Sequence, residues 1–229
     1  MASNSRVILV TGSNTGIGYE LVRLLASKGH TVYLSSRNEQ SGQNAVKKLK
    51  EEHSLNVKYV RLDVTDEQSV TSAKDIIEEA EGKLDALVNN AGIVIFSSMP
   101  SQLDINQVNE ILNTNYLGVI RVTTAFIPLI RKAGNGVILN VSSEVGSHTA
   151  QSQLAERFLA DFGYVLRFEG YLELVHYFVG KRIEGGRGGR SATVGAEVLL
   201  PWVLLSPGED KTGIFYGHRT NGNVEEIPW

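Results

Sequence analysis

The sequence predicts an α/β protein with a doubly wound parallel sheet, folded as a single domain over residues 1–229. Two observations support this prediction. Apolar runs alternate with amphipathic segments through the first 143 residues, and a glycine-rich turn follows the first apolar run. Runs that are apolar throughout are typical of strands buried on both faces of a parallel sheet. Alternation of such strands with helices places helices on both faces of the sheet.

Each expected element has its own signal. We expect strands where the apolar runs lie, at residues 7–10, 31–34, 57–62, 84–88 and 137–141. Helices are expected between them, with apolar side chains on one face at Ile17, Leu21, Leu24 and Leu25, then at Val46 and Leu49, then at Val70, Ala73, Ile76 and Ile77, and last from about 106 to 132. Gly29 is placed to end the first helix, and Thr65–Gln68 predicts a capping box that opens the third.

The regular alternation ends after Ser143. Residues 144–190 are expected to be irregular. The glycine- and arginine-rich run at 185–190 reads as a solvated loop, because glycine costs about 1 kcal/mol at a helical position. Such a run can also bind RNA, but one short run in a slightly acidic chain is more often a loop.

Composition excludes several classes of function. The chain of 229 residues is 42% hydrophobic and 21% charged, with a net charge of −3 and no cysteine. It therefore has no disulfide, no thiolate zinc site and no cysteine nucleophile, and its charge does not favour nucleic acid. The five histidines show no metal-ligand spacing, so no metal is expected. The apolar run 198–205 contains a proline and is too short to span a membrane, and no signal peptide is expected, so the protein is expected in the cytoplasm.

A glycine motif joins the first strand to the first helix. Gly12 suits a tight turn, Gly16 lets a pyrophosphate approach the backbone, and Gly18 lets the helix pack closely on the strand. The N–H groups and positive dipole end of the following helix then favour phosphate. The alternative is an ordinary glycine-rich strand–helix turn. The flanking strand and helix favour a Rossmann-type dinucleotide site.

Four further motifs follow in order along the chain. They are Asp63-Val64 after the third strand, Asn89-Asn90-Ala91-Gly92 after the fourth, Asn115 in the long helix and Ser142-Ser143 at the end of the fifth strand. With the glycine motif, this set resembles the short-chain dehydrogenases/reductases, and the chain's closing residues resemble the carbonyl-reductase-like branch. The resemblance implies that a dinucleotide contacts Gly12, Ser13, Asn14, Gly16, Ile17, Gly18, Arg37, Asp63, Val64, Asn90, Ala91 and Gly92. Taken without the motif, Asn115 could be a buried structural amide, Ser143 a turn residue and Asn90 a cap of the strand edges.

The choice of cofactor depends on the end of the second strand. A carboxylate there selects NAD(H), whereas an arginine accommodates the 2′-phosphate of NADP(H). The chain has Ser35-Ser36-Arg37, which favours NADP(H). Thr15 stands where many NADP-dependent relatives have a second basic residue. Arg37 could also be an ordinary surface arginine.

The catalytic pair departs from the family pattern. The family's Tyr-x-x-x-Lys usually lies about a dozen residues after the serine, where this chain has Glu156 and Ala160. A literal match occurs later, at Tyr177 and Lys181. The resemblance implies that Tyr177 is the general acid or base, that Lys181 lowers its pKa, that Ser143 binds the carbonyl oxygen, and that Asn115 holds a water of the proton relay.

Two functions follow from this pattern. The first is an NADP(H)-dependent oxidoreductase that interconverts a small carbonyl compound and its alcohol. The second is a dinucleotide-binding protein without redox turnover, acting as a sensor, partner or inactive paralogue, because Tyr177 and Lys181 could equally be surface residues. A serine hydrolase has little support, since Ser143 lacks a Gly-x-Ser-x-Gly motif. The resemblance also implies a sixth strand beyond Ser143, which in this chain is either replaced or missing.

Overall fold

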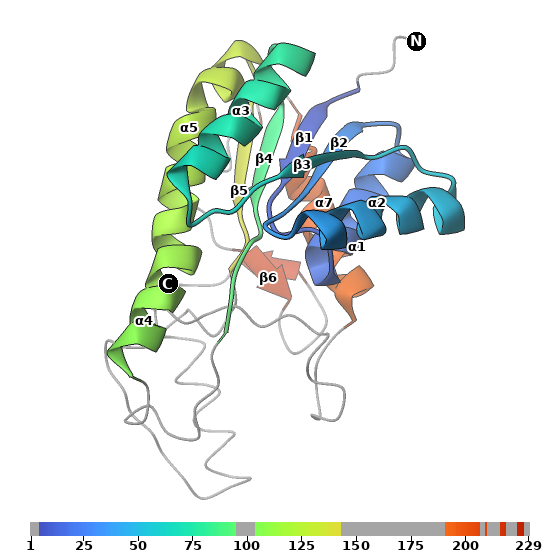
Figure 1. Ribbon diagram of the computed structural model, residues 1–229. Coiled ribbons are helices and arrows are strands. Elements are labelled where there is room, and N and C mark those ends of the chain that lie inside the picture. The colour runs from blue at the N-terminus through green and yellow to red at the C-terminus, as the bar shows by residue number, and fades with distance from the viewer. Residues whose placement is uncertain are drawn as a thin grey trace, which may run out of the picture.

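The computed structural model describes residues 5–94, 104–142, 191–206, 209, 216–218 and 224–226. In this part of the chain, five parallel strands form one sheet in the order β3-β2-β1-β4-β5 (Figure 1). The strands are β1 (Val7–Val10), β2 (Thr31–Ser36), β3 (Lys58–Arg61), β4 (Ala86–Asn89) and β5 (Val137–Asn140). The predicted fold class is confirmed, and each predicted strand is present with ends that differ by a few residues.

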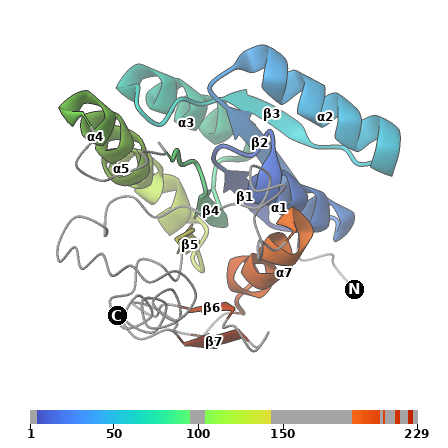
Figure 2. The same cartoon turned by 90° about the horizontal axis from the view of Figure 1, so that it is seen from below.

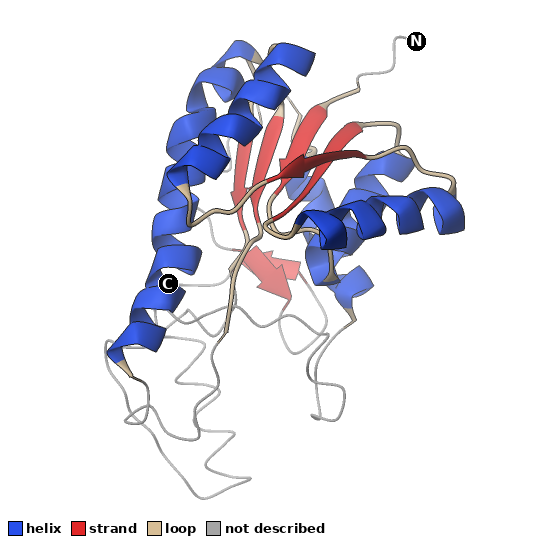
Figure 3. Ribbon diagram, in the orientation of Figure 1, coloured by secondary structure: helices blue, strands red, loops and turns tan. Residues whose placement is uncertain are grey.

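Helices connect these strands, as the coloured ribbon in Figure 3 shows. They are α1 (Gly16–Ser27), α2 (Glu39–His53), α3 (Glu67–Glu81), α4 (Ile105–Leu112), a π-helical turn (Asn113–Leu117), α5 (Gly118–Lys132) and α7 (Ala192–Val203). A separate antiparallel pair joins β6 (Tyr216–His218) to β7 (Val224–Glu226). None of the helices within the described ranges is long and apolar enough to cross a membrane.

The helices form two layers around the sheet (Figure 2). On one face, α3 and α5 bury apolar residues such as Ile77 and Phe126 against β1 and β4. On the other face, α1, α2 and α7 bury residues such as Leu21, Leu49 and Val203 against the same strands. Strands covered on both faces must be apolar throughout, which is why the β1 sequence has no polar alternation.

The start of α3 differs from the sequence prediction. The helix is capped by Asp66, whose carboxylate accepts from the N–H groups of Gln68 and Ser69, so a capping box at Thr65 is wrong. Thr65 is occupied elsewhere, because its N–H and hydroxyl both donate to Asp63 Oδ1, at 3.0 and 2.7 Å. The neighbouring aspartate is therefore left to cap the helix.

The long helix predicted near residues 106–132 is present, but a π-helical turn divides it. Asp104 opens α4 with a capping box completed by Gln107, and the helical backbone continues through the π turn into α5. A π turn adds one residue to a helical turn, which hydrophobic spacing alone does not reveal. Gly118 follows the π turn and lies against Val64, where a Cβ on the glycine would be 2.9 Å from Val64 Cγ2.

The helix α7 contacts the residue before β1, although 197 residues separate the two hydrogen-bonded residues in the sequence. The Arg6 guanidinium donates to the carbonyls of Val203 (3.0 Å) and Leu205 at the end of α7. At the start of α7, Gly195 lies so close to α1 that a Cβ there would be 2.8 Å from Ile17 Cγ1. Thus α7 is held at its C-terminal end by Arg6, which precedes β1, and packs against α1 near its start.

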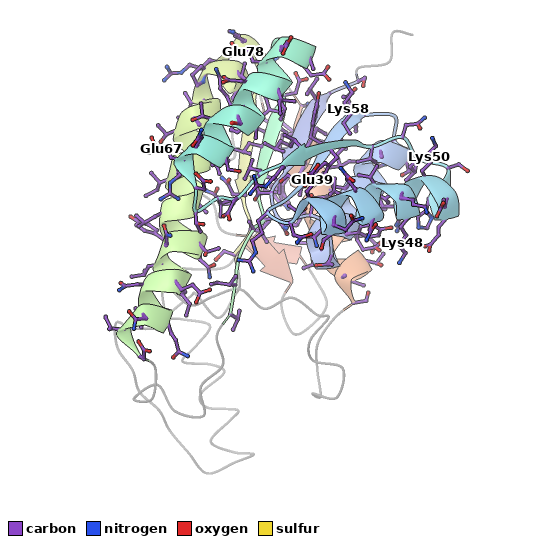
Figure 4. All side chains as sticks on the ribbon, viewed as in Figure 1. Glu39, Lys48, Lys50, Lys58, Glu67 and Glu78 are labelled. Atoms are coloured by element: carbon purple, nitrogen blue, oxygen red, sulfur yellow. The ribbon has the colours of Figure 1, made fainter. Side chains whose placement is uncertain are left out.

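An ion-pair network joins α3 to its neighbours at the end of the helix where Glu78 lies (Figure 4). Glu78 accepts from Lys132 of α5 at 2.6 Å and from Lys74 at 2.5 Å. Hydrogen bonds from Lys132 and then Lys74 lower the pKa of Glu78 to about 2. At the neighbouring Glu81, Tyr33 donates from its hydroxyl at 2.8 Å, and burial followed by this bond raises the pKa of Tyr33 to about 12.

Candidate cofactor and active site

The predicted site residues that the structure describes lie at or near the carboxyl edge of the sheet, which is the lower edge in Figure 1 and faces the viewer in Figure 2. All five strands of this sheet run parallel, so the segments that follow them leave the sheet at the same edge. The strand order reverses between β1 and β4. From β1 the chain continues to β2 and β3 on one side, and then returns to β4 and β5 on the other side of β1. Ligands of open α/β sheets bind outside this reversal point.

The glycine-rich turn after β1 is held in a conformation that favours glycine. Gly12 has φ +58 and Gly16 has φ +66, and residues other than glycine rarely adopt these backbone angles. A Cβ on Gly12 would lie 2.7 Å from the Cα of Ala91, and a Cβ on Gly18 would lie 2.9 Å from the Cα of Ser13. The turn from β1 into α1 therefore packs closely against neighbouring backbone at these two glycines.

The N-terminus of α1 differs from those of the other helices that begin at a loop. Side chains of Asn38, Asp66, Asp104 and Ser191 cap α2, α3, α4 and α7. Thr15 makes no side-chain capping bond to α1, and the first turn of α1 has no acidic residue. The first N–H groups of α1 are therefore available to an anion, and the helix dipole adds a positive potential there.

Thr11 fastens the segment after β4 to this turn. Its Oγ1 accepts from the backbone N–H groups of Asn90 and Ala91, both at 2.9 Å. The Asn90 side chain, which is buried, donates from Nδ2 to the carbonyls of Thr11 (2.8 Å) and Gly12 (3.1 Å). Gly92 follows at intermediate burial. These bonds join the two segments on either side of the reversal point into one rigid surface.

The predicted residues of the turn divide into two groups. The Ser13 side chain is fully buried, accepts from the N–H of Ser35 at 3.0 Å and donates to the carbonyl of Val10 at 2.7 Å, so it shapes the turn from inside. Asn14 and Ile17 are half-buried, and Ile17 packs its side chain toward α7. Ser13 therefore supports the turn from inside, whereas Asn14 and Ile17 remain partly accessible at its surface.

The ends of β2 and β3 form the far side of the site. Arg37 is exposed directly after β2, and Ser35 and Ser36 before it are buried. After β3, Asp63 uses Oδ1 to accept from Thr65, and Val64 is held by a hydrogen bond from Arg121 Nη1 to its carbonyl. This part of the edge therefore has an exposed cation beside a fixed, partly apolar surface.

The π turn brings Asn115 to the segment that follows β4. Its Oδ1 accepts from the N–H of Ile93 at 2.8 Å, and its Nδ2 donates to the carbonyl of Ile93 at 2.9 Å. Nearby, Asn89 Nδ2 donates to Asn140 Oδ1 (2.8 Å) and to Thr123 Oγ1 (3.0 Å), joining β4, β5 and α5. These amides fix the strand ends on which a catalytic group after β5 would depend.

Comparison with known protein families identifies the chain's relationship. The family profile described as short chain dehydrogenase matches residues 6–155, well over half of the chain. The chain belongs to the short-chain dehydrogenase family. The match includes the glycine-rich turn, the segment after β4, the π turn and the end of β5.

Individual members of the family show the same relationship. Over 165 residues the chain is 39% identical to short-chain dehydrogenase/reductase 1 of Saponaria officinalis, an alignment that covers 63% of this chain and 55% of that protein. Over 147 residues it is 40% identical to carbonyl reductase (NADPH) 1 of Sus scrofa, covering 64% of this chain and 50% of that protein. The chain thus spans about half the length of the curated relatives it matches.

Solved structures of family members are also similar. An alcohol dehydrogenase of the archaeon Thermococcus sibiricus, complexed with 5-hydroxy-NADP, aligns with a TM-score of 0.68 and 25% identity over 90% of this chain and 93% of that one. A menthone neomenthol reductase of Mentha piperita aligns with a TM-score of 0.68 and 26% identity over 90% and 96%.

The remaining family positions lie outside the described residues. Ser143, Tyr177 and Lys181, the predicted catalytic residues other than Asn115, belong to this part, as does the irregular segment predicted at 144–190. Two residues that matter in the site were missed by the sequence analysis. Thr11 could have been found as a hydroxyl residue at the strand end before the first glycine, whereas nothing in the local sequence points to Arg121.

Proposed function

We propose that this protein is an NADP(H)-dependent oxidoreductase that interconverts a small carbonyl compound and its alcohol. The observation that carries the proposal is the joined surface of the glycine-rich turn and Asn90-Ala91 at the reversal point of the sheet, next to an uncapped helix N-terminus. This arrangement suits a pyrophosphate, because it offers backbone N–H groups and a positive dipole end without a competing side chain.

The residues present fit a dinucleotide along the whole edge. Gly12, Asn14 and Gly16–Gly18 would hold the pyrophosphate, and Asn90, Ala91 and Gly92 would line the ribose next to it. Asp63 and Val64 would bind the adenine, since Asp63 keeps Oδ2 free of any bond within the described part of the chain. When bound, the nicotinamide supplies hydride transfer, and the protein supplies orientation and electrostatics.

The preference for NADP(H) follows from Arg37. No carboxylate stands at the end of β2 to bind a ribose 2′-hydroxyl, and the exposed guanidinium suits a 2′-phosphate. The names of related proteins support this choice, because carbonyl reductases of Sus scrofa and Rattus norvegicus are described with NADPH.

The proton chemistry is assigned to four residues. Tyr177 donates a proton to the carbonyl oxygen during reduction and accepts it during oxidation. Ser143 donates a hydrogen bond to that oxygen, and the Lys181 cation lowers the pKa of Tyr177. Asn115 retains one N–H and one lone pair beyond its two bonds to Ile93, which suffices to hold a water of the proton relay.

Cofactor titration followed by turnover tests the proposal. We expect quenching of protein fluorescence by NADPH at lower concentrations than by NADH, and we expect Arg37→Asp to reverse that order. With NADPH, a panel of ketones and aldehydes is then assayed by loss of absorbance of the reduced nicotinamide. Tyr177→Phe should lower turnover at least a hundredfold while leaving NADPH affinity unchanged. Binding of NADPH without turnover of any carbonyl would favour a dinucleotide-binding protein instead.

A further inference from the structure

A second arginine lies beside Arg37 at the end of the sheet. In the parallel register of β2 and β3, Ser36 is paired with Arg61, and the N–H of Leu62 donates to the carbonyl of Ser36 at 3.1 Å. Arg61 and Arg37, the residue after Ser36, therefore lie at the same ends of neighbouring strands, offset by one residue in register. The Nε of Arg61 donates to the carbonyl of Arg37 at 3.4 Å, and both side chains are exposed.

The positive charge of this pair is not neutralised by nearby acids. Within the described ranges, neither Arg37 nor Arg61 takes part in a salt bridge. The adjacent acids have other partners, because Glu39 accepts from the side chain of Gln43 at 3.0 Å and Asp63 accepts from Thr65. Two exposed arginines at neighbouring strand ends give this part of the edge a positive potential, which favours a phosphate.

The bond at Nε also determines what the rest of the Arg61 guanidinium can do. Anchoring Nε on a backbone carbonyl positions the group at the strand end and leaves the Nη1 and Nη2 donors for a ligand. Paired donors of this kind match the oxygens of a phosphate. A lysine at this position would supply the charge without the paired geometry.

We propose that Arg61 is a second specificity-determining residue, which binds the 2′-phosphate of NADP(H) together with Arg37. This inference rests on the proposed function. Thr15 stands where many NADP-dependent relatives have a second basic residue. It is exposed in the glycine-rich turn and offers no charge to the phosphate. In this chain the second cation comes from the end of β3 instead.

The test compares affinities for NADPH and NADH, measured by fluorescence or calorimetry, in the full chain. We expect Arg61→Gln to weaken NADPH about tenfold or more, as for loss of a charge-assisted hydrogen bond, and to change NADH less than twofold. Arg61→Lys should keep part of the NADPH preference, because it keeps the charge. Lys50→Gln is the matched control, since it removes one exposed positive charge from α2 at the end away from Glu39 (Figure 4).

A fragment separates the phosphate from the rest of the cofactor. Adenosine 2′,5′-bisphosphate should compete with NADPH more strongly than 5′-AMP does, and Arg61→Gln should narrow that difference. Equal weakening of NADPH and NADH in Arg61→Gln would overturn the inference, because it would mean that Arg61 only supports the strand end. Wild-type protein that binds neither dinucleotide would overturn the proposed function itself. Wild-type protein that prefers NADH would overturn the phosphate role of both arginines.

Discussion

Asn115 hydrogen-bonds to both polar groups of the Ile93 backbone, accepting from its N–H at 2.8 Å and donating to its carbonyl at 2.9 Å. One side chain thus binds a peptide segment much as a neighbouring strand would. The bonds connect the π turn to the segment that follows β4, which Thr11 also holds at Asn90 and Ala91. Because the Ile93 N–H requires an acceptor and its carbonyl requires a donor, the two bonds also determine which way the Asn115 amide faces.

Replacement of Asn115 by alanine should therefore destabilise the protein. Loss of both bonds leaves the half-buried Ile93 groups without their partner, and we expect a loss of about 1–3 kcal/mol in the free energy of unfolding, measured in urea. Asn109→Ala, at an exposed position of α4, is the control and should change stability by less than about 0.5 kcal/mol. Equal stability of the two variants would show that the paired bonds contribute nothing.

Gly12→Ala should lose both stability and cofactor binding. An alanine at φ +58 would have a strained backbone, and its Cβ would lie 2.7 Å from the Cα of Ala91. Gly134→Ala is a matched control, because Gly134 has φ +78 with no atom within 4 Å of an added Cβ. The control should cost about 1 kcal/mol from backbone strain alone.

Urea unfolding and NADPH titration are both measured for the two glycine variants. The difference between them isolates the contact between the turn and the segment after β4. Should Gly12→Ala bind NADPH like the wild type, the packed turn would not be needed to hold the pyrophosphate.

Glu78 should make stability depend on acid pH. Hydrogen bonds from Lys132 and Lys74 lower its pKa from 4.5 to about 2 in the folded protein. Because the folded value is lower than the unfolded one, the stabilisation is present above pH 4.5 and is lost as the pH falls toward about 2. In Glu78→Gln the loss of Tm across this range should be smaller than in the wild type.

The neighbouring Glu79 provides the control for Glu78, because Glu79→Gln removes the same charge from α3 without removing the bonds to Lys132 and Lys74. Both measurements are repeated in 1 M salt, at a screening length of about 3 Å, where the ion pairs of the exposed network weaken. An identical acid response in Glu78→Gln and the wild type would exclude the network as its source.

Arg6→Gln should loosen the end of α7. The guanidinium holds the carbonyls of Val203 and Leu205, which a shorter amide cannot reach together. We expect faster hydrogen exchange in α7, with unchanged exchange in β2 at the other side of β1. Arg131→Gln, an exposed position in the last turn of α5, should leave α7 exchange as it is in the wild type.

The centre of the sheet could be predicted because β1 and β4 lie between two helical layers and are buried at every residue, whereas β3 and β5, at the ends of the described sheet, have exposed positions. Val7–Val10 has no polar residue, and the regions of the other four strands were located by the same signal. The site was harder to predict, because its shape depends on contacts between distant residues. Thr11 meets Asn90 and Ala91 across the reversal point, and Arg121 reaches the carbonyl of Val64 from α5.

Local competition explains the errors of detail. Thr65 has a residue type that is common at helix caps, but its hydroxyl donates to Asp63, and Asp66 caps the helix. The π turn at Asn115 leaves the apolar spacing of the long helix almost unchanged, so its single added residue gives no signal in the sequence. Both features depend on contacts and backbone geometry of the folded chain rather than on residue type alone.

The attachment of α7 also bears on how the protein folds during synthesis. Ala196 and Val203 complete a core that otherwise consists of β1, β2, β4, α1 and α2, and Arg6 reaches a carbonyl 197 residues further along the chain. At roughly 5–20 residues per second, a ribosome needs many seconds to supply that helix after β1 has emerged. Throughout that interval the apolar residues that α7 contacts in the folded protein lack this partner, and apolar surface exposed during folding promotes aggregation.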